Sequence, residues 1–227
     1  MQSIKEELSI RVEEIDSVIT LLQLMENGQL ECQSETPNFI MVKTSIKAGI
    51  ILMLYNAVES TVTKCLERMH GILINQGLMF DDCNDSLKQL VVVYYENAKE
   101  KVTDVHNKAP HILRFYEYIN GNRGFELTYE QMSKFYSLYS GNLDSREIIS
   151  VLEKYGIGFQ ERISELKTIK DKRNQLAHGE LSFEEVGREL SLQQLNHMKE
   201  RTFTYLEKLI DEINRYIEDE QYKKHSY

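Results

Sequence analysis

The stretch from Lys170 to Glu180, KDKRNQLAHGE, places an arginine, an asparagine and a histidine close together at the predicted end of a helix. On a helical wheel Arg173 falls about 20° from the centre of the apolar stripe. A guanidinium is costly in such a position unless a carboxylate or a phosphate meets it. Asn174 and His178 lie one turn apart on an adjoining face. Gly179 predicts a C-terminal cap. The stretch therefore indicates an arginine that needs an anion beside a proton-exchanging histidine.

Glu59, in LYNAVEST, is a second charged residue on an apolar helical face. We expect it to face Arg173 between two packed helices, because pairing leaves neither charge buried alone. An ordinary buried ion pair without a functional role explains the two positions equally well. His178 taken alone is typical of a histidine that interacts with a helix dipole, and the spacing of Arg and His also arises by chance.

The elements that position these residues are predicted to be helices, because apolar residues recur at steps of three and four almost throughout. The fold class is all-α, with about seven helices over residues 3–26, 44–75, 85–106, 110–119, 145–156, 159–178 and 191–220. We call the helix predicted over residues 159–178 the motif helix, because it contains Arg173, Asn174 and His178. Its buried face is expected to contain Ile163, Leu166, Ile169, Leu176 and Ala177.

The middle of the chain is its least regular part. There we expect Pro110 in the first turn of a helix, and Asp144 or Ser145 as the cap of another. GFELTY could form a short edge strand. We expect one domain over residues 1–227, in which residues 110–158 form an inserted subdomain or a lid.

Composition and charge exclude several classes of function and location. The net charge is -9, which argues against bulk electrostatic binding of nucleic acid. Cys32, Cys65 and Cys83 are scattered and odd in number, so neither a disulfide framework nor a zinc site is indicated. The N-terminus lacks a signal-peptide core. The longest strongly apolar run, residues 48–55, is short for a membrane helix. A cytoplasmic protein without a membrane partner is expected.

No cofactor or metal site is predicted. The chain has no glycine-rich phosphate loop, which disfavours a nucleotide-binding domain. Asp81, Asp82 and Asp85 are close in sequence but lack the spacing of a metal cage. They are better interpreted as a loop that initiates a helix, so a metal-dependent nuclease is disfavoured.

RNQLAHGE at residues 173–180 resembles the signature of the HEPN superfamily of all-α RNases and nucleotide-binding domains. The similarity extends to three further blocks, KAGIILMLYNAVESTV at 47–62, SGNLDSREIISVLEKYGI at 140–157 and LSFEEVGREL at 181–190. Together they resemble the prokaryotic MAE-type branch, from about residue 40 to 220.

The resemblance implies a metal-independent endoribonuclease, often a toxin or phage-defence component, whose site forms where two subunits join their motif helices. Arg173 would bind the RNA phosphate, and His178 would transfer protons. Asn174 would orient His178 or a phosphate oxygen, and Glu59 would hold Arg173. Implied partners are an RNA substrate, a second copy of the chain, and an antitoxin or defence-system protein. A non-catalytic helical binding or scaffold module is the alternative.

Overall fold

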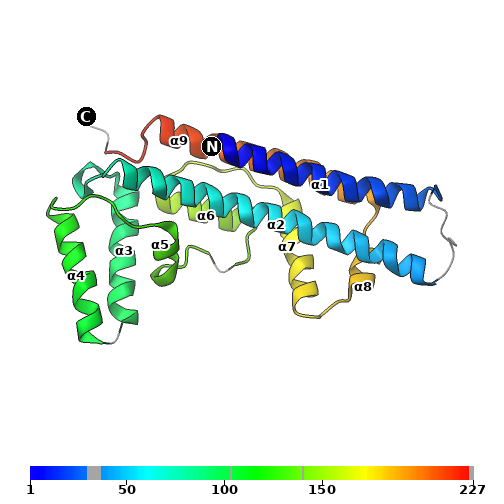
Figure 1. The fold of residues 1–227 in the computed structure, drawn as a ribbon, viewed down its shortest axis with the longest axis horizontal. Helices are drawn as coiled ribbons and strands as arrows, with labels where there is room; N and C mark the ends of the chain where they lie inside the picture. Colours follow the sequence, from blue (N-terminus) through cyan, green and yellow to red (C-terminus); the bar gives the residue numbers. More distant parts are fainter. Residues whose placement is uncertain (30–36, 103, 140, 225–227) are drawn as a thin grey trace.

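The protein is described by a computed structural model that covers residues 1–29, 37–102, 104–139 and 141–224 (Figure 1). The described residues form helices in the order α1 (Gln2–Glu26), α2 (Pro37–Asn75), the short 3-10 helix η1 (Phe80–Asp82), α3 (Asp85–Lys101), α4 (Val105–Ile119), α5 (Tyr129–Phe135), α6 (Ser145–Tyr155), α7 (Ser164–Ala177), α8 (Phe183–Arg188) and α9 (Leu192–Glu218). The only bridge between extended residues in this part of the chain joins Cys83 and Lys223. The predicted all-α class is confirmed.

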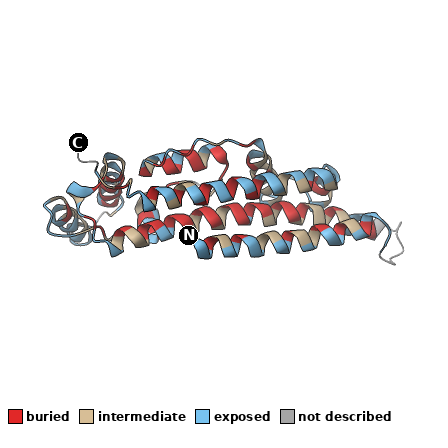
Figure 2. Ribbon diagram, turned by 90° about the horizontal axis from the view of Figure 1, so that it is seen from above, coloured by how far each residue is buried: buried red, intermediate tan, exposed pale blue. Residues whose placement is uncertain are grey.

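The central element is α2, which contacts α1, α5, α7, α8 and α9. Its apolar positions turn toward α1 and α9, and Figure 2 shows the buried faces of the long helices turned toward one another. The first helix runs antiparallel to α2, and ion pairs of Lys47 with Glu26 and of Lys64 with Glu7 fix this register. By length and composition, residues 38–75 also match a membrane-spanning helix, as core helices of soluble bundles do.

A close approach of two backbones fixes α8 against α2. A Cβ atom at Gly187 would lie 2.0 Å from the carbonyl oxygen of Thr44. Only glycine lets α8 pack at this distance. Since α8 follows directly on the loop after α7, this contact also anchors the end of the motif helix.

The segment from α3 to α6 lies beside the C-terminal half of α2, at the opposite end of that helix from α8 (Figure 1). At its centre is His70 of α2, which is 1% exposed. Its Nδ1 lies 2.6 Å from the Leu127 carbonyl, so Nδ1 donates, and Nε2 accepts from the Tyr155 hydroxyl at 2.8 Å. Burial lowers the pKa of His70 to about 4. A neutral histidine therefore joins three segments.

The helix boundaries differ from the predicted ones in the middle of the chain. Pro110 lies inside α4 and not in its first turn, because Asp104 caps the helix further upstream. Capping boxes at Thr128 and Ser182 start two short helices, α5 and α8, that were not predicted. GFELTY forms no strand in the described residues.

Other predictions in this region hold. Asp144 caps α6, which Gly156 ends. Asp85 lies in the first turn of α3, as expected for a helix-initiating loop.

Candidate functional site

The motif helix α7 ends as the sequence predicts. The N–H of Gly179 donates to Leu176 O at 3.2 Å, and the N–H of Glu180 donates to Gln175 O at 2.9 Å. This is the double hydrogen bond of a Schellman motif, with Gly179 in the left-handed conformation at φ +69°. His178 is the C-cap residue and is exposed. The imidazole therefore stands at the open end of the helix, where a substrate can reach it.

The predicted buried face of α7 is correct for its first turns only. Leu166 and Ile169 are buried, and Ile163 is buried as the N-cap. Leu176 is half-buried, and Ala177 is exposed. The last turn of α7 projects away from α2 toward the side where α3, α4 and α5 also lie (Figure 1). The motif residues thus lie at the edge of the core.

Arg173 is half-buried and stacks on an aromatic ring. Its guanidinium carbon lies 4.5 Å from the centre of the Tyr55 ring. Its Nη1 donates to Asn174 Oδ1 at 2.9 Å. Within the described part of the chain, no carboxylate forms an ion pair with it. The positive charge of the guanidinium is therefore available to bind an anion from outside the described chain.

The predicted ion pair between Glu59 and Arg173 is wrong, although their helices do pack together. Glu59 is half-buried and lines an open groove of about 450 Å³ between α1 and α2, together with Arg11, Asn56, Ser60, Thr63, Lys64 and Glu67. Both charges retain contact with solvent, so neither needs the other for compensation. The aromatic ring of Tyr55 occupies the position that we expected a carboxylate to take.

One face of α7 is held by the segment that leads into α6. Lys170, Asn174 and His178 follow at steps of four residues and so share this face. Lys170 Nζ donates to Asp144 Oδ2 at 2.6 Å, and Asn174 Nδ2 donates to Asn142 Oδ1 at 2.8 Å. The segment therefore runs antiparallel to α7, with Asn142 nearer to the His178 end of the helix than Asp144.

Asp144 joins this segment to two helices. Its Oδ1 accepts from the N–H groups of Arg146 and Glu147, which caps α6, while Oδ2 binds Lys170 of α7. Burial alone would raise the pKa of the Asp144 carboxyl, but these hydrogen bonds outweigh it and lower the pKa. The carboxylate form thus stabilises the site.

Tyr55 anchors the same segment from the other side. It is 1% exposed, and its hydroxyl donates to Gly141 O at 2.6 Å and accepts from the N–H of Leu143 at 3.2 Å. Burial raises the pKa of this hydroxyl, which keeps its proton for the bond to Gly141.

Sequence reasoning missed Tyr55 and Asn142 as site residues. Tyr55 reads as an apolar core position on the same face as Glu59. Asn142 lies 32 residues before Asn174, and no periodic pattern links them.

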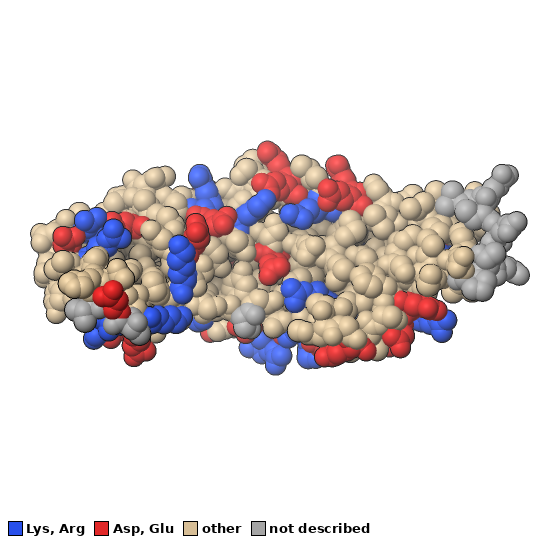
Figure 3. Space-filling view, turned by 60° about the horizontal axis from the view of Figure 1, so that its bottom comes forward, with Lys and Arg blue, Asp and Glu red and all other residues tan. Residues whose placement is uncertain are grey.

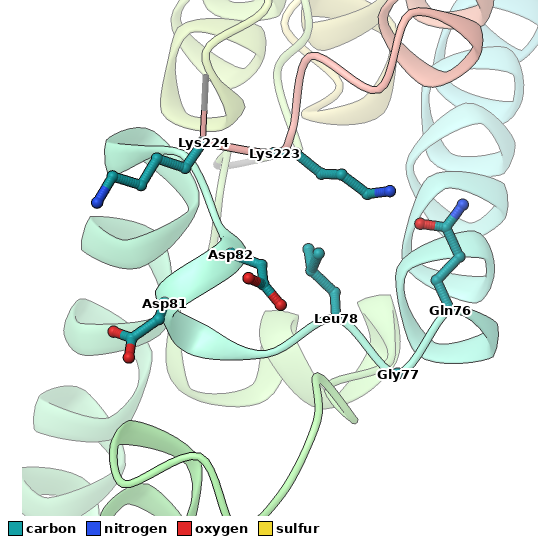
Figure 4. A pocket seen from close by; sticks show the side chains of 7 residues that line it. All are labelled: Gln76, Gly77, Leu78, Asp81, Asp82, Lys223 and Lys224. Atoms are coloured by element: carbon teal, nitrogen blue, oxygen red, sulfur yellow. The ribbon is translucent and has the colours of Figure 1, made fainter. Parts of the chain in front are cut away.

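An open surface pocket of about 510 Å³ is lined by none of the motif residues. It is bounded by residues 76–78, Asp81, Asp82, Lys223 and Lys224. In Figure 4, Asp81 and Asp82 point apart. Among the described residues, no three His, Cys, Asp or Glu side chains are placed to share a metal ion.

Comparison with known proteins assigns the chain to a family. The model of the MAE_28990-like HEPN family matches residues 1–222, so α1 belongs to the family unit as well as the expected region from about residue 40 to 220. No curated protein and no solved structure matches the chain significantly. The chain belongs to the MAE_28990-like HEPN family.

Proposed function

We propose that this protein is an endoribonuclease whose site contains Arg173, Asn174 and His178. The observation that carries the proposal is the state of Arg173: it is stacked and oriented but has no carboxylate partner among the described residues. A guanidinium held in this way offers its remaining N–H groups to a phosphate, which they can bind in bidentate fashion. His178 stands exposed one turn beyond Asn174.

The proposed reaction uses the nucleophile that RNA itself carries. The 2'-oxygen forms a bond to the adjacent phosphorus while the bond to the 5'-oxygen breaks. A base takes the proton of the 2'-hydroxyl, and an acid gives one to the leaving oxygen. The products are a 2',3'-cyclic phosphate and a 5'-hydroxyl. His178 transfers protons, and Arg173 stabilises the charge on the phosphate oxygens.

A second copy of the chain completes the site in this proposal. One Arg and one His are few for a protein with a net charge of -9, and a two-fold axis beside α7 doubles both. Two imidazoles can then serve as base and acid.

The first half of α2, the helix that packs against α7, has a surface that suits such a partner. From residue 38 to 58, α2 carries only two charged residues: Lys47 pairs with Glu26, and Lys43 lies over the ring of Phe39. Ile40, Met41 and Val42 are 45–49% exposed. Toward the end of the molecule where α2 begins, the face in Figure 3 is largely uncharged, with acidic and basic side chains along its lower edge. Exposed apolar side chains with few charges around them support an interaction surface here.

Sedimentation velocity tests the dimer. We expect wild-type protein to sediment as a dimer at micromolar concentration and the double variant Met41→Glu, Val42→Glu as a monomer. Ile10→Glu, at an apolar residue of α1 that is 56% exposed, is the matched control and leaves the dimer intact. A monomeric wild type counts against the proposal.

Cleavage of total RNA in the presence of a chelator tests the activity. We expect the wild type to cleave RNA and His178→Ala to be nearly inactive. His197→Ala removes another exposed histidine, which pairs with Glu165 on the groove between α7 and α9, and should cut normally. Arrest of cell growth by the wild type, absent with His178→Ala, would support a toxin or defence role.

The alternative is a non-catalytic interaction module, and the edge helix α4 favours it. This helix packs mainly against α3 and η1, its His111 ring lies 5.2 Å from the Phe135 ring of α5, and its Leu113 and Tyr116 are 62% and 56% exposed. Binding of an antitoxin or defence-system protein there would be lost in Leu113→Asp and retained in His178→Ala. Such binding without any cleavage by the wild type would favour the module.

A further inference from the structure

The residue that holds Arg173 in place is the starting point of this inference, which rests on the proposed ribonuclease activity. A catalytic arginine needs a fixed orientation, yet its charge must remain available. A carboxylate neighbour would orient it but would also neutralise it and occupy its N–H groups. Stacking on an aromatic face orients the guanidinium plane and leaves its edge free to donate.

The guanidinium of Arg173 lies over the ring of Tyr55. The centre of this ring lies 4.5 Å from the guanidinium carbon. The ring is fixed, because Tyr55 is 1% exposed and both hydrogen-bonding capacities of its hydroxyl are used within the segment 141–143. Burial and these two hydrogen bonds therefore hold the ring in one orientation.

A second path links Tyr55 to the motif. The segment that its hydroxyl holds also carries Asn142, whose side-chain oxygen accepts from Asn174 Nδ2 at 2.8 Å. The other end of the Asn174 amide, Oδ1, accepts from Arg173 Nη1 at 2.9 Å. Asn174 cannot rotate without losing one of these two bonds. Ring and hydroxyl thus act on the same guanidinium, one directly and one through Asn142 and Asn174.

We propose that Tyr55 is the positioning residue for Arg173, and that it couples the segment 141–144 to the phosphate-binding site. Glu59 has no part in this coupling. The region before α6 then supports the site, because Asn142 and Asp144 of its segment 141–144 form hydrogen bonds with α7.

A double-mutant cycle on RNA cleavage tests the direct path. We expect Tyr55→Leu, which removes the ring together with the hydroxyl, to have a kcat/KM about 2- to 30-fold below that of Tyr55→Phe, which keeps the ring; this is the range of cation–π interactions. In the Arg173→Ala background the same change should have no further effect. Tyr118→Leu removes another buried tyrosine, on the α3–α4 side, and should lower the melting temperature without changing kcat/KM.

The indirect path has its own cycle, which does not depend on Tyr55→Leu folding. Tyr55→Phe keeps the ring and loses the hydroxyl, and Asn142→Ala breaks the bond to Asn174. Each should lower kcat/KM, and the double variant should lose no more than the larger single effect. Tyr205→Phe is the control, since the Tyr205 hydroxyl is buried without a hydrogen-bond partner in the described residues.

The outcomes separate the two proposals. Equal cleavage by wild type and His178→Ala would overturn the ribonuclease proposal itself. Normal dependence on His178, combined with a folded Tyr55→Leu as active as wild type, would overturn only the role of Tyr55. So would effects of Tyr55→Leu that are undiminished in the Arg173→Ala background.

Discussion

Asn174 Nδ2 lies 2.8 Å from Asn142 Oδ1, and this contact joins the motif helix to the irregular middle of the chain. One turn earlier on α7, Lys170 binds Asp144 of the same segment. The motif therefore does not rest on one helix. Its orientation depends on a segment that the sequence places about thirty residues upstream.

We predict that the contact of Lys170 with Asp144 is a main support of this arrangement. Their side chains are 15% and 5% exposed, so Lys170→Ala leaves the buried carboxylate with only the more distant and exposed Arg146 as a cation and should cost about 1–3 kcal/mol. Lys167→Ala, which breaks an exposed pair with Asp171 on the same helix, should cost less than about 0.5 kcal/mol. Urea unfolding of the two variants measures the difference, and equal losses would contradict this role of Lys170.

The approach of α8 to α2 gives a second prediction. Gly187→Ala places a methyl group against backbone that cannot yield, so α8 must move, at a cost of about 1–3 kcal/mol or more. Gly71→Ala, inside α2 with no atom within 4 Å of the added carbon, should instead stabilise by about 0.5–1 kcal/mol. Thermal unfolding compares the two. Equal melting temperatures would show that the predicted clash is absorbed.

The third prediction concerns pH. The pKa of His70 is about 4 in the fold, against 6.5 as its ordinary value, so the unfolded chain binds the proton more tightly. Stability should fall as pH drops from about 6.5 toward 4, with a loss of about 2 kcal/mol by pH 4.5.

His70→Gln isolates this effect. The glutamine amide can donate to Leu127 O and accept from the Tyr155 hydroxyl but does not titrate. Chemical unfolding at pH 7 and 4.5 should therefore show a smaller loss in the variant. Identical pH dependence in the two proteins would contradict the assignment.

The fourth prediction follows from the absence of an ion pair between Glu59 and Arg173. Glu59→Gln should leave RNA cleavage within about threefold of wild type, because Glu59 lines a groove and does not hold Arg173. Arg173→Lys keeps the charge but loses both the planar group over the Tyr55 ring and bidentate phosphate binding, so this variant should not cleave RNA. Initial rates at limiting RNA measure both. A Glu59→Gln variant as poor as Arg173→Lys would restore the direct role first expected for Glu59.

The sequence predicts the parts of this fold that depend on periodicity and local caps. The long helices, the Asp144 cap and the end of α7 at Gly179 all follow from such signals. Short helices such as α5 carry too few residues for a periodic pattern. The partner of Arg173 could not be predicted, since a helical wheel shows that a side chain faces inward but not what it meets. Tyr55 looks apolar until the tertiary fold brings the guanidinium onto its ring.

The most direct test of the account is cleavage of a matched pair of oligonucleotides in EDTA. One is RNA that the enzyme cuts at a mapped site, and the other differs only by a hydrogen in place of the 2'-hydroxyl at that site. The account predicts that wild type cuts only the first and leaves a 2',3'-cyclic phosphate, and that His178→Ala is slower by about 10²- to 10⁴-fold. Cleavage of the deoxy-substituted strand at that position, or activity that EDTA stops and magnesium restores, would contradict it.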